Sequence, residues 1–176
     1  MEVRIGACPT ARSEECHVFL DDGSSEMTLV QDAEPFQILL VEDSASDISM
    51  TREALRDSRD LTEINVVRDG IEAMDYLRGE GAFVGMPRPD LVLLDLNMPR
   101  MGGREVLSAM KADVSLMQIP VVVLSTSTAD EDVRESYQLH ANAYVSKPVA
   151  LDDFITAVGA VQQFWMETAR RPGATH

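Results

Sequence analysis

The chain has 176 residues, 45% of them hydrophobic and 26% charged, which is typical of a soluble globular protein with a sizeable core. Its formal net charge of −15 argues against nucleic acid or an anionic membrane as a direct ligand, because both require a basic face. No apolar run approaches the ~20 residues of a bilayer-spanning helix, and no basic region with a long apolar core marks a signal peptide.

Residues 1–34 differ in composition from the rest of the chain. They contain eight acidic residues against two arginines, and both cysteines of the chain, Cys8 and Cys16. A disulfide between these cysteines would staple no core, so a reducing, cytoplasmic location is the simpler inference. We expect residues 1–34 to be an acidic N-terminal extension, for which composition allows either a flexible arm or a weak hairpin. A domain over 35–168 and a C-terminal tail over 169–176 are expected to follow.

From residue 36 onward, apolar runs alternate with amphipathic segments. The apolar runs predict five strands, over 36–41, 62–68, 91–94, 119–124 and 143–146. The amphipathic segments predict helices over 45–57, from Gly70 through Leu77, and over 103–111, 130–139 and 151–168. Five alternations of strand and helix predict an α/β layered fold with a parallel sheet and right-handed crossovers.

Polar residues follow the predicted strands at the points where they end. In a doubly wound five-stranded parallel sheet of order 2-1-3-4-5, strands one, three, four and five contribute to the crevice at the switch point. These strands end in three carboxylates, a hydroxyl and an ammonium, which are Glu42 and Asp43, Asp95, Ser125, and Lys147. Each residue taken alone has an ordinary structural explanation, but their gathering at one edge of the sheet indicates a site.

The chemistry that suits this set is phosphoryl transfer onto a carboxylate. Crowded acids repel one another, and Mg²⁺, which takes carboxylate oxygens and water as ligands, relieves that repulsion. Asp95 is the candidate nucleophile, forming an aspartyl phosphate. Mg²⁺ and Lys147 are expected to neutralise the charge of the transferred group, and Ser125 to donate a hydrogen bond to it.

Four motifs in this order resemble the signature of response-regulator receiver domains. They are Val41-Glu42-Asp43-Ser44, Leu94-Asp95-Leu96-Asn97-Met98-Pro99, Ser125-Thr126 and Lys147-Pro148. The resemblance covers about residues 36–165 and implies the flavodoxin-like receiver fold. It implies a signalling phosphoacceptor rather than an enzyme acting on other molecules, in which Asp95 takes its phosphoryl group from a histidine kinase.

The resemblance also implies roles for residues around the phosphoacceptor. Glu42, Asp43 and the backbone carbonyl of Asn97 are expected to bind Mg²⁺ together with Asp95. Ser125 and Tyr144 are expected to move together as the switch that reports phosphorylation. A cis peptide bond before Pro148 is expected to place the lysine that precedes it.

A narrower resemblance is to the response regulators of bacterial phytochromes. It is carried by Tyr76-Leu77-Arg78-Gly79-Glu80-Gly81, Pro87-Arg88-Pro89-Asp90, Asn97-Met98-Pro99-Arg100-Met101, Ser136-Tyr137 and Phe164-Trp165. It implies a red-light photoreceptor kinase as the partner. The sequence departs from the pattern at Gly102, where Asp is frequent, and at Ser125, where Thr is commoner. Because aromatic residues are enriched at interfaces, we expect a homodimer through the fourth helix, fifth strand and last helix.

Two other functional classes stay open at this point. A haloacid-dehalogenase-type phosphatase also uses an aspartate nucleophile at a strand end, but it requires a second Asp two residues later, where this chain has Asn97. The other class is a phosphorylation-independent binding module on a receiver scaffold. The full set of five site residues argues against it, since a scaffold does not need them all.

Overall fold

The computed structural model describes residues 35–56 and 62–170. The arm or hairpin expected over residues 1–34, and most of the tail expected over 169–176, lie outside the described residues. Within the described part of the chain, no helix combines the length and the apolar character needed to cross a membrane.

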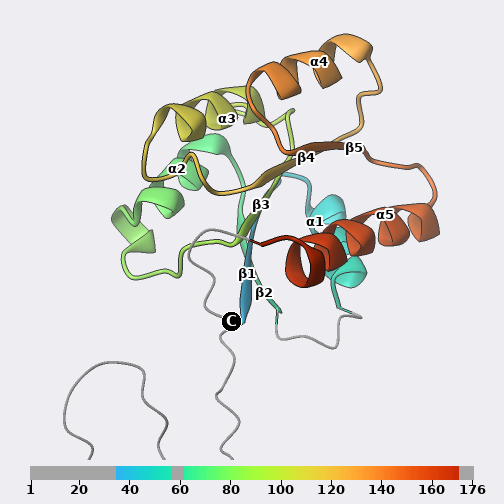
Figure 1. Ribbon diagram of the computed structural model, residues 1–176, viewed down its shortest axis with the longest axis horizontal. Helices are drawn as coiled ribbons and strands as arrows, with labels where there is room; N and C mark the ends of the chain where they lie inside the picture. Colours follow the sequence, from blue (N-terminus) through green and yellow to red (C-terminus); the bar gives the residue numbers. More distant parts are fainter. Residues whose placement is uncertain (1–34, 57–61, 171–176) are drawn as a thin grey trace, which may run out of the picture. The chain divides into compact units, whose positions relative to one another are not determined.

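The centre of the domain is a five-stranded parallel sheet (Figure 1). Its strands are β1 (Phe36–Val41), β2 (Thr62–Val67), β3 (Leu91–Leu94), β4 (Val121–Ser125) and β5 (Ala143–Ser146). Their order in the sheet is β2-β1-β3-β4-β5, which confirms the doubly wound arrangement. Strand β3 lies between β1 and β4, with Leu94 paired with Val41 on one side and Val123 on the other. The chain therefore carries Asp95 out of the middle of the sheet.

Helices cover both faces of this sheet (Figure 1). They are α1 (Ala45–Ala54), α2 (Gly70–Arg78), α3 (Gly103–Ala112), α4 (Asp130–Gln138) and α5 (Leu151–Gln163), with a short 3-10 turn, η1 (Gly81–Phe83). Helices α1 and α5 lie on one face, and α2, α3 and α4 on the other. A π-helical turn, η2 (Phe164–Thr168), follows α5, so the last helix is regular over fewer residues than its pattern predicts.

Two apolar layers hold the helices to the sheet. Leu39 and Val41 of β1 face the layer shared with α2 and α3, whereas Ile38 and Leu40 face the layer shared with α1 and α5. Strands β1, β3 and β4 are buried along their whole length, as continuous apolar runs in a parallel sheet require. Burial on both faces leaves polar side chains room only at the strand ends.

Some element boundaries differ from those that the sequence predicts. Strand β4 begins at Val121 rather than at residue 119, because Pro120 has no N–H to donate to the ladder. It extends to Ser125, which pairs with Ser146 of β5. Helix α1 ends at Ala54, with Leu55 as its C-cap, whereas the pattern predicts a helix to residue 57, which lies outside the described residues.

Candidate functional site

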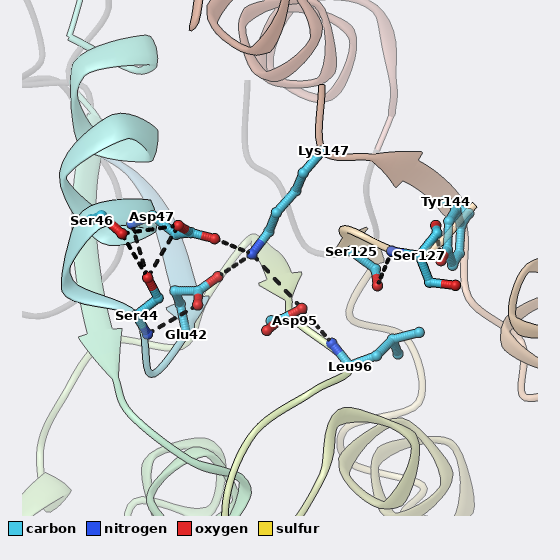
Figure 2. Close-up of polar contacts among 10 residues, drawn as sticks. All are labelled: Glu42, Ser44, Ser46, Asp47, Asp95, Leu96, Ser125, Ser127, Tyr144 and Lys147. Carbon is cyan, nitrogen blue, oxygen red and sulfur yellow. Dashed lines mark hydrogen bonds and ion pairs between the residues drawn. The ribbon is translucent and has the colours of Figure 1, made fainter. Parts of the chain in front are cut away.

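The polar residues predicted from the strand ends meet at the carboxyl edge of the sheet (Figure 2). Glu42 and Asp43 directly follow β1, and Asp95 directly follows β3. Ligand oxygens of these three carboxylates all lie within 4.8 Å of one another. Ser125 closes β4, and Lys147 follows β5, reaching back toward the carboxylates. The structure thus brings together the residues that sequence alone placed on four separate strands.

Asp95 is buried, with 7% of its surface exposed. The backbone N–H of Leu96 donates to its Oδ1 at 2.9 Å, and the N–H of Asn97 also favours the charged form of the carboxylate. Burial raises the pKa of Asp95, and the charge of Asp43 adds to the rise, while Lys147 and the two N–H groups oppose it. The carboxylate is therefore oriented by the backbone at a site where negative charge is disfavoured.

Lys147 has acidic partners that sequence analysis did not assign to it. Its Nζ lies 2.6 Å from Glu42 Oε2 and 2.7 Å from Asp47 Oδ2, but 3.8 Å from Asp95 Oδ1. The side chain is only 6% exposed. Asp47, in the first turn of α1, is thus part of the site. Its position after Glu42-Asp43-Ser44 is the one signal in the sequence, but an acid in a first turn is ordinarily a capping residue.

The proton affinities in this cluster reflect burial and the shared lysine. Burial raises the pKa of Glu42, against the hydrogen bond and charge of Lys147. Burial alone would raise the pKa of Asp47 too, but Lys147 and the hydroxyls of Ser44 and Ser46 outweigh it and the pKa is lowered. Burial would lower the pKa of Lys147, but its acidic partners outweigh that effect and raise it. The lysine is therefore held in its charged form.

Ser125 and Tyr144 are connected through a third residue. Ser125 is fully buried, and its Oγ accepts a hydrogen bond from the N–H of Ser127 at 3.2 Å. The hydroxyl of Tyr144 donates to the carbonyl oxygen of the same Ser127 at 2.9 Å. The Tyr144 ring packs against the apolar layer on the α2–α3 face. The loop after β4 is thereby tied both to the buried hydroxyl and to the aromatic ring (Figure 2).

The cis peptide bond expected before Pro148 is not present. The described residues contain no cis peptide bond, and trans is the favoured state of an X–Pro bond. Lys147 is placed instead by its backbone, whose N–H donates to the carbonyl oxygen of Ser125 at 2.7 Å. The side chain reaches Glu42 from this trans arrangement, so that expectation was wrong.

The loop between β3 and α3 is fixed against the site by its backbone. The N–H of Gly103, the first residue of α3, donates to the carbonyl oxygen of Leu96 at 3.0 Å. A Cβ on Gly103 would lie 2.1 Å from the carbonyl oxygen of Asp95, so only glycine permits this approach. Farther along, Arg100 forms an ion pair with the buried Asp69, the N-cap of α2. Asn97, at the start of this loop, is exposed.

The chemistry available here follows from the donor set. Glu42, Asp43 and Asp95 present only oxygen ligands, which are those that Mg²⁺ and other hard divalent cations take. Beside them stands the ammonium group of Lys147, and the buried hydroxyl of Ser125 lies at the same edge. Such a set can neutralise a group that carries several negative oxygens close to Asp95.

Comparison with known proteins places this chain in a family. Residues 38–159 match the family described as the response regulator receiver domain. The chain is 45% identical over 140 residues to the response regulator Rcp1 of Synechocystis sp., which covers 80% of this chain and 95% of Rcp1. It is 40% identical over 155 residues to the probable methanogenesis regulatory protein FilR2 of Methanothrix harundinacea, covering 88% of this chain and 96% of FilR2.

Solved structures agree in fold over nearly the whole described domain. The structure of the phosphorylated cyanobacterial phytochrome response regulator RcpA matches with a TM-score of 0.76 and 47% identity, over 79% of this chain and 99% of RcpA. The Mn²⁺-bound form of Rcp1 matches with a TM-score of 0.75, over 79% of this chain and 100% of that one. The chain therefore belongs to the response-regulator receiver family, the signalling proteins of two-component systems.

Proposed function

We propose that this response regulator signals by accepting a phosphoryl group on Asp95 from a histidine kinase. The observation that carries the proposal is the position of Asp95, buried at the carboxyl edge of β3 between two further carboxylates and Lys147. The solved structure of RcpA, which is that of a phosphorylated response regulator, supports it. The protein is proposed to act as a phosphoacceptor in the cytoplasm, with no chemistry beyond its own phosphorylation and dephosphorylation.

Glu42, Asp43 and Asp95, with the backbone carbonyl of Asn97, are proposed to hold Mg²⁺. The three carboxylates, whose ligand oxygens lie within 4.8 Å of one another, would suit a hard divalent cation, and the Mn²⁺-bound structure of Rcp1 supports a divalent metal. When bound, Mg²⁺ would supply positive charge that offsets the negative charge of the carboxylates and of the arriving phosphoryl group.

In the proposed reaction, a carboxylate oxygen of Asp95 attacks phosphorus. The new O–P bond forms as the N–P bond of the donor phosphohistidine breaks, and the bonding electron pair returns to the imidazole nitrogen. The backbone N–H of Leu96 holds the attacking carboxylate in place. Lys147 stabilises the negative oxygens of the transferred group, and Ser125 donates a hydrogen bond to one of them.

The switch is proposed to run from Ser125 to Tyr144 through Ser127. If Ser125 turns its hydroxyl to a phosphoryl oxygen, the loop that its Oγ now holds through the Ser127 N–H is drawn with it. The hydrogen bond from Tyr144 to the Ser127 carbonyl then has to change as well. Phosphorylation shifts this equilibrium only by stabilising one arrangement more than the other.

The partner is proposed to be a histidine kinase of the phytochrome type. The likeness to RcpA, a phytochrome response regulator, supports this assignment. FilR2, which is 40% identical to this chain, is named as a probable methanogenesis regulatory protein. The pairing with a phytochrome kinase is therefore tested directly. Purified phytochrome kinase should transfer phosphate to this protein at a rate that depends on red against far-red illumination. Transfer that is absent in both states would assign the protein to another kinase.

We also propose a homodimer formed through α4, β5 and α5. Large apolar side chains are exposed along these elements, namely Tyr137 at 51%, Leu151 at 49% and Phe164, which directly follows α5, at 51%. Phe164 and Trp165 stack edge to face with ring centroids 5.3 Å apart, an arrangement that adds aromatic area at the end of α5. Equilibrium sedimentation is expected to show a dimer, and a monomer both with and without phosphorylation would contradict the proposal.

The test of the central proposal is intact mass after incubation with acetyl phosphate. One added phosphoryl group is expected in the presence of Mg²⁺, and none without Mg²⁺ or in Asp95→Asn. Asp153→Asn, which removes an exposed acid in the first turn of α5, is the matched control and should be modified like the natural protein. If no mass is added, beryllofluoride, a stable mimic of the phosphoryl group, separates a short-lived phosphate from a phosphorylation-independent module, which would not bind it.

A further inference from the structure

Lys147, the cation beside Asp95, is shared unequally among three acids (Figure 2). Its contacts with Glu42 and Asp47, at 2.6 and 2.7 Å, are charge-assisted hydrogen bonds. Its distance of 3.8 Å to Asp95 Oδ1 is too long for one. Two of the three ammonium protons are therefore donated to acids other than the phosphoacceptor.

Asp47 is held so that one of its oxygens serves the lysine. Its Oδ1 accepts from the hydroxyls of Ser44 and Ser46, at 3.1 and 3.3 Å, and its Oδ2 accepts from Lys147. An acid at the third position of a helix commonly accepts from the N–H of the N-cap residue. Here the N–H of the N-cap, Ser44, donates to Glu42 Oε1 at 3.1 Å instead. Capping therefore does not account for the direction of the second oxygen.

Asp47 also differs from Glu42 in its relation to the proposed metal ligands. Glu42 belongs to the three-carboxylate cluster, and Asp47 does not. If Glu42 held a cation, the oxygen that bound the cation would no longer accept from Lys147, whereas the oxygens of Asp47 would stay available to the lysine. Asp47 is then the acid that competes with phosphoryl oxygens for the protons of Lys147.

We infer that Asp47 is a positioning residue that restrains Lys147, and so limits how strongly the lysine stabilises a phosphoryl group on Asp95. The inference rests on the proposed phosphorylation of Asp95. As a consequence, Asp47 makes the phosphorylated state less stable than it would be if Lys147 were free to contact the phosphoryl group. Replacement of Asp47 by the isosteric, uncharged Asn should release the lysine toward Asp95.

The affinity for beryllofluoride in the presence of Mg²⁺ measures this release. Asp47→Asn is expected to bind beryllofluoride about tenfold more tightly than the natural protein, the order expected for loss of one competing hydrogen bond to a charged group that is partly exposed. Glu53→Gln is the matched control, because it removes one negative charge from the same helix. Glu53 is 54% exposed and pairs with Arg56 at 2.8 Å, so its replacement should leave the affinity unchanged.

Lysine side-chain NMR reports the restraint directly, without metal or phosphoryl mimic. Lys111 and Lys147 are the two lysines of the chain, so a lysine-labelled sample gives two ammonium signals. The Lys147 signal should shift in Asp47→Asn, and its protons should exchange faster with water. The Lys111 signal should stay in place, because its Nζ donates to the carbonyl oxygens of Met117 and Ile119. An unchanged Lys147 signal would overturn the inference.

A double-mutant cycle separates the restraint from a general effect of charge. In a Lys147→Met background, Asp47→Asn is expected to give no gain in affinity for beryllofluoride. The same gain in both backgrounds would mean that Asp47 acts through its negative charge and not through Lys147, and the inference would be wrong. If the natural protein and Asp47→Asn bound beryllofluoride equally well, the inference would be wrong but the proposed function would stand. No binding by the natural protein would overturn the proposed function as well.

Discussion

Replacement of Gly103 by alanine should disrupt the site by displacing the backbone of Asp95 and Leu96. An ideal Cβ at this position would lie 2.1 Å from the Asp95 carbonyl oxygen, 2.8 Å from Leu96 Cα and 2.9 Å from the Asp95 carbonyl carbon. All three are main-chain atoms in the segment that leaves β3, so no flexible side chain can move aside. Overpacking a core costs about 1–3 kcal/mol, and we expect the upper end, about 3 kcal/mol, because the backbone itself has to shift.

Urea unfolding followed by circular dichroism tests this magnitude. A loss of about 3 kcal/mol lowers the folding equilibrium constant by about two orders of magnitude. Gly159→Ala is the control, because its Cβ would meet nothing within 4 Å in the middle of α5, and alanine in a helix is favoured over glycine by up to about 1 kcal/mol. The displaced Asp95 should also slow phosphorylation by acetyl phosphate. If Gly103→Ala were as stable as the natural protein, the close approach of α3 to β3 would be refuted.

Three further predictions concern the metal, the pH dependence and the switch. Mg²⁺ at about 100 times its dissociation constant should stabilise the natural protein by about 2.7 kcal/mol in thermal unfolding; Asp43→Asn should lose most of this gain, and an equal gain would argue against the cluster as the metal site. Burial raises the pKa of Asp95 above its ordinary value of 3.8, so the folded protein holds the proton more tightly than the unfolded chain does. The stability of the fold therefore falls as the pH rises from 3.8 through the pKa of the folded protein. Metal-free Asp95→Asn should thus be more stable than the natural protein at neutral pH, with the difference in urea unfolding shrinking as pH falls toward 3.8; a difference that does not depend on pH would contradict this. Tyr144→Phe removes the hydrogen bond to the Ser127 carbonyl and should cost about 1 kcal/mol, while the beryllofluoride-induced NMR shift of the Ser127 amide should shrink; an unchanged shift would remove Tyr144 from the switch.

The layout of the domain could be predicted from local patterns. The bounds of β3 agree with the apolar run over 91–94, because a strand buried on both faces excludes polar residues until it ends. The same rule put Asp95 at the end of the central strand. Once the strand order followed from the alternation and the resemblance, the gathering of the site residues at one edge followed too, since all parallel strands end on the same side.

What the local pattern could not decide depends on contacts between distant segments. The Nζ of Lys147 lies 2.7 Å from Asp47 Oδ2 but 3.8 Å from Asp95 Oδ1. This difference is set by how α1 and the chain after β5 pack around the sheet. Hydrophobic periodicity carries information about the face and length of an element. The direction of a charged side chain among several acids is a balance of burial and hydrogen bonds, which exists only once the tertiary structure has formed.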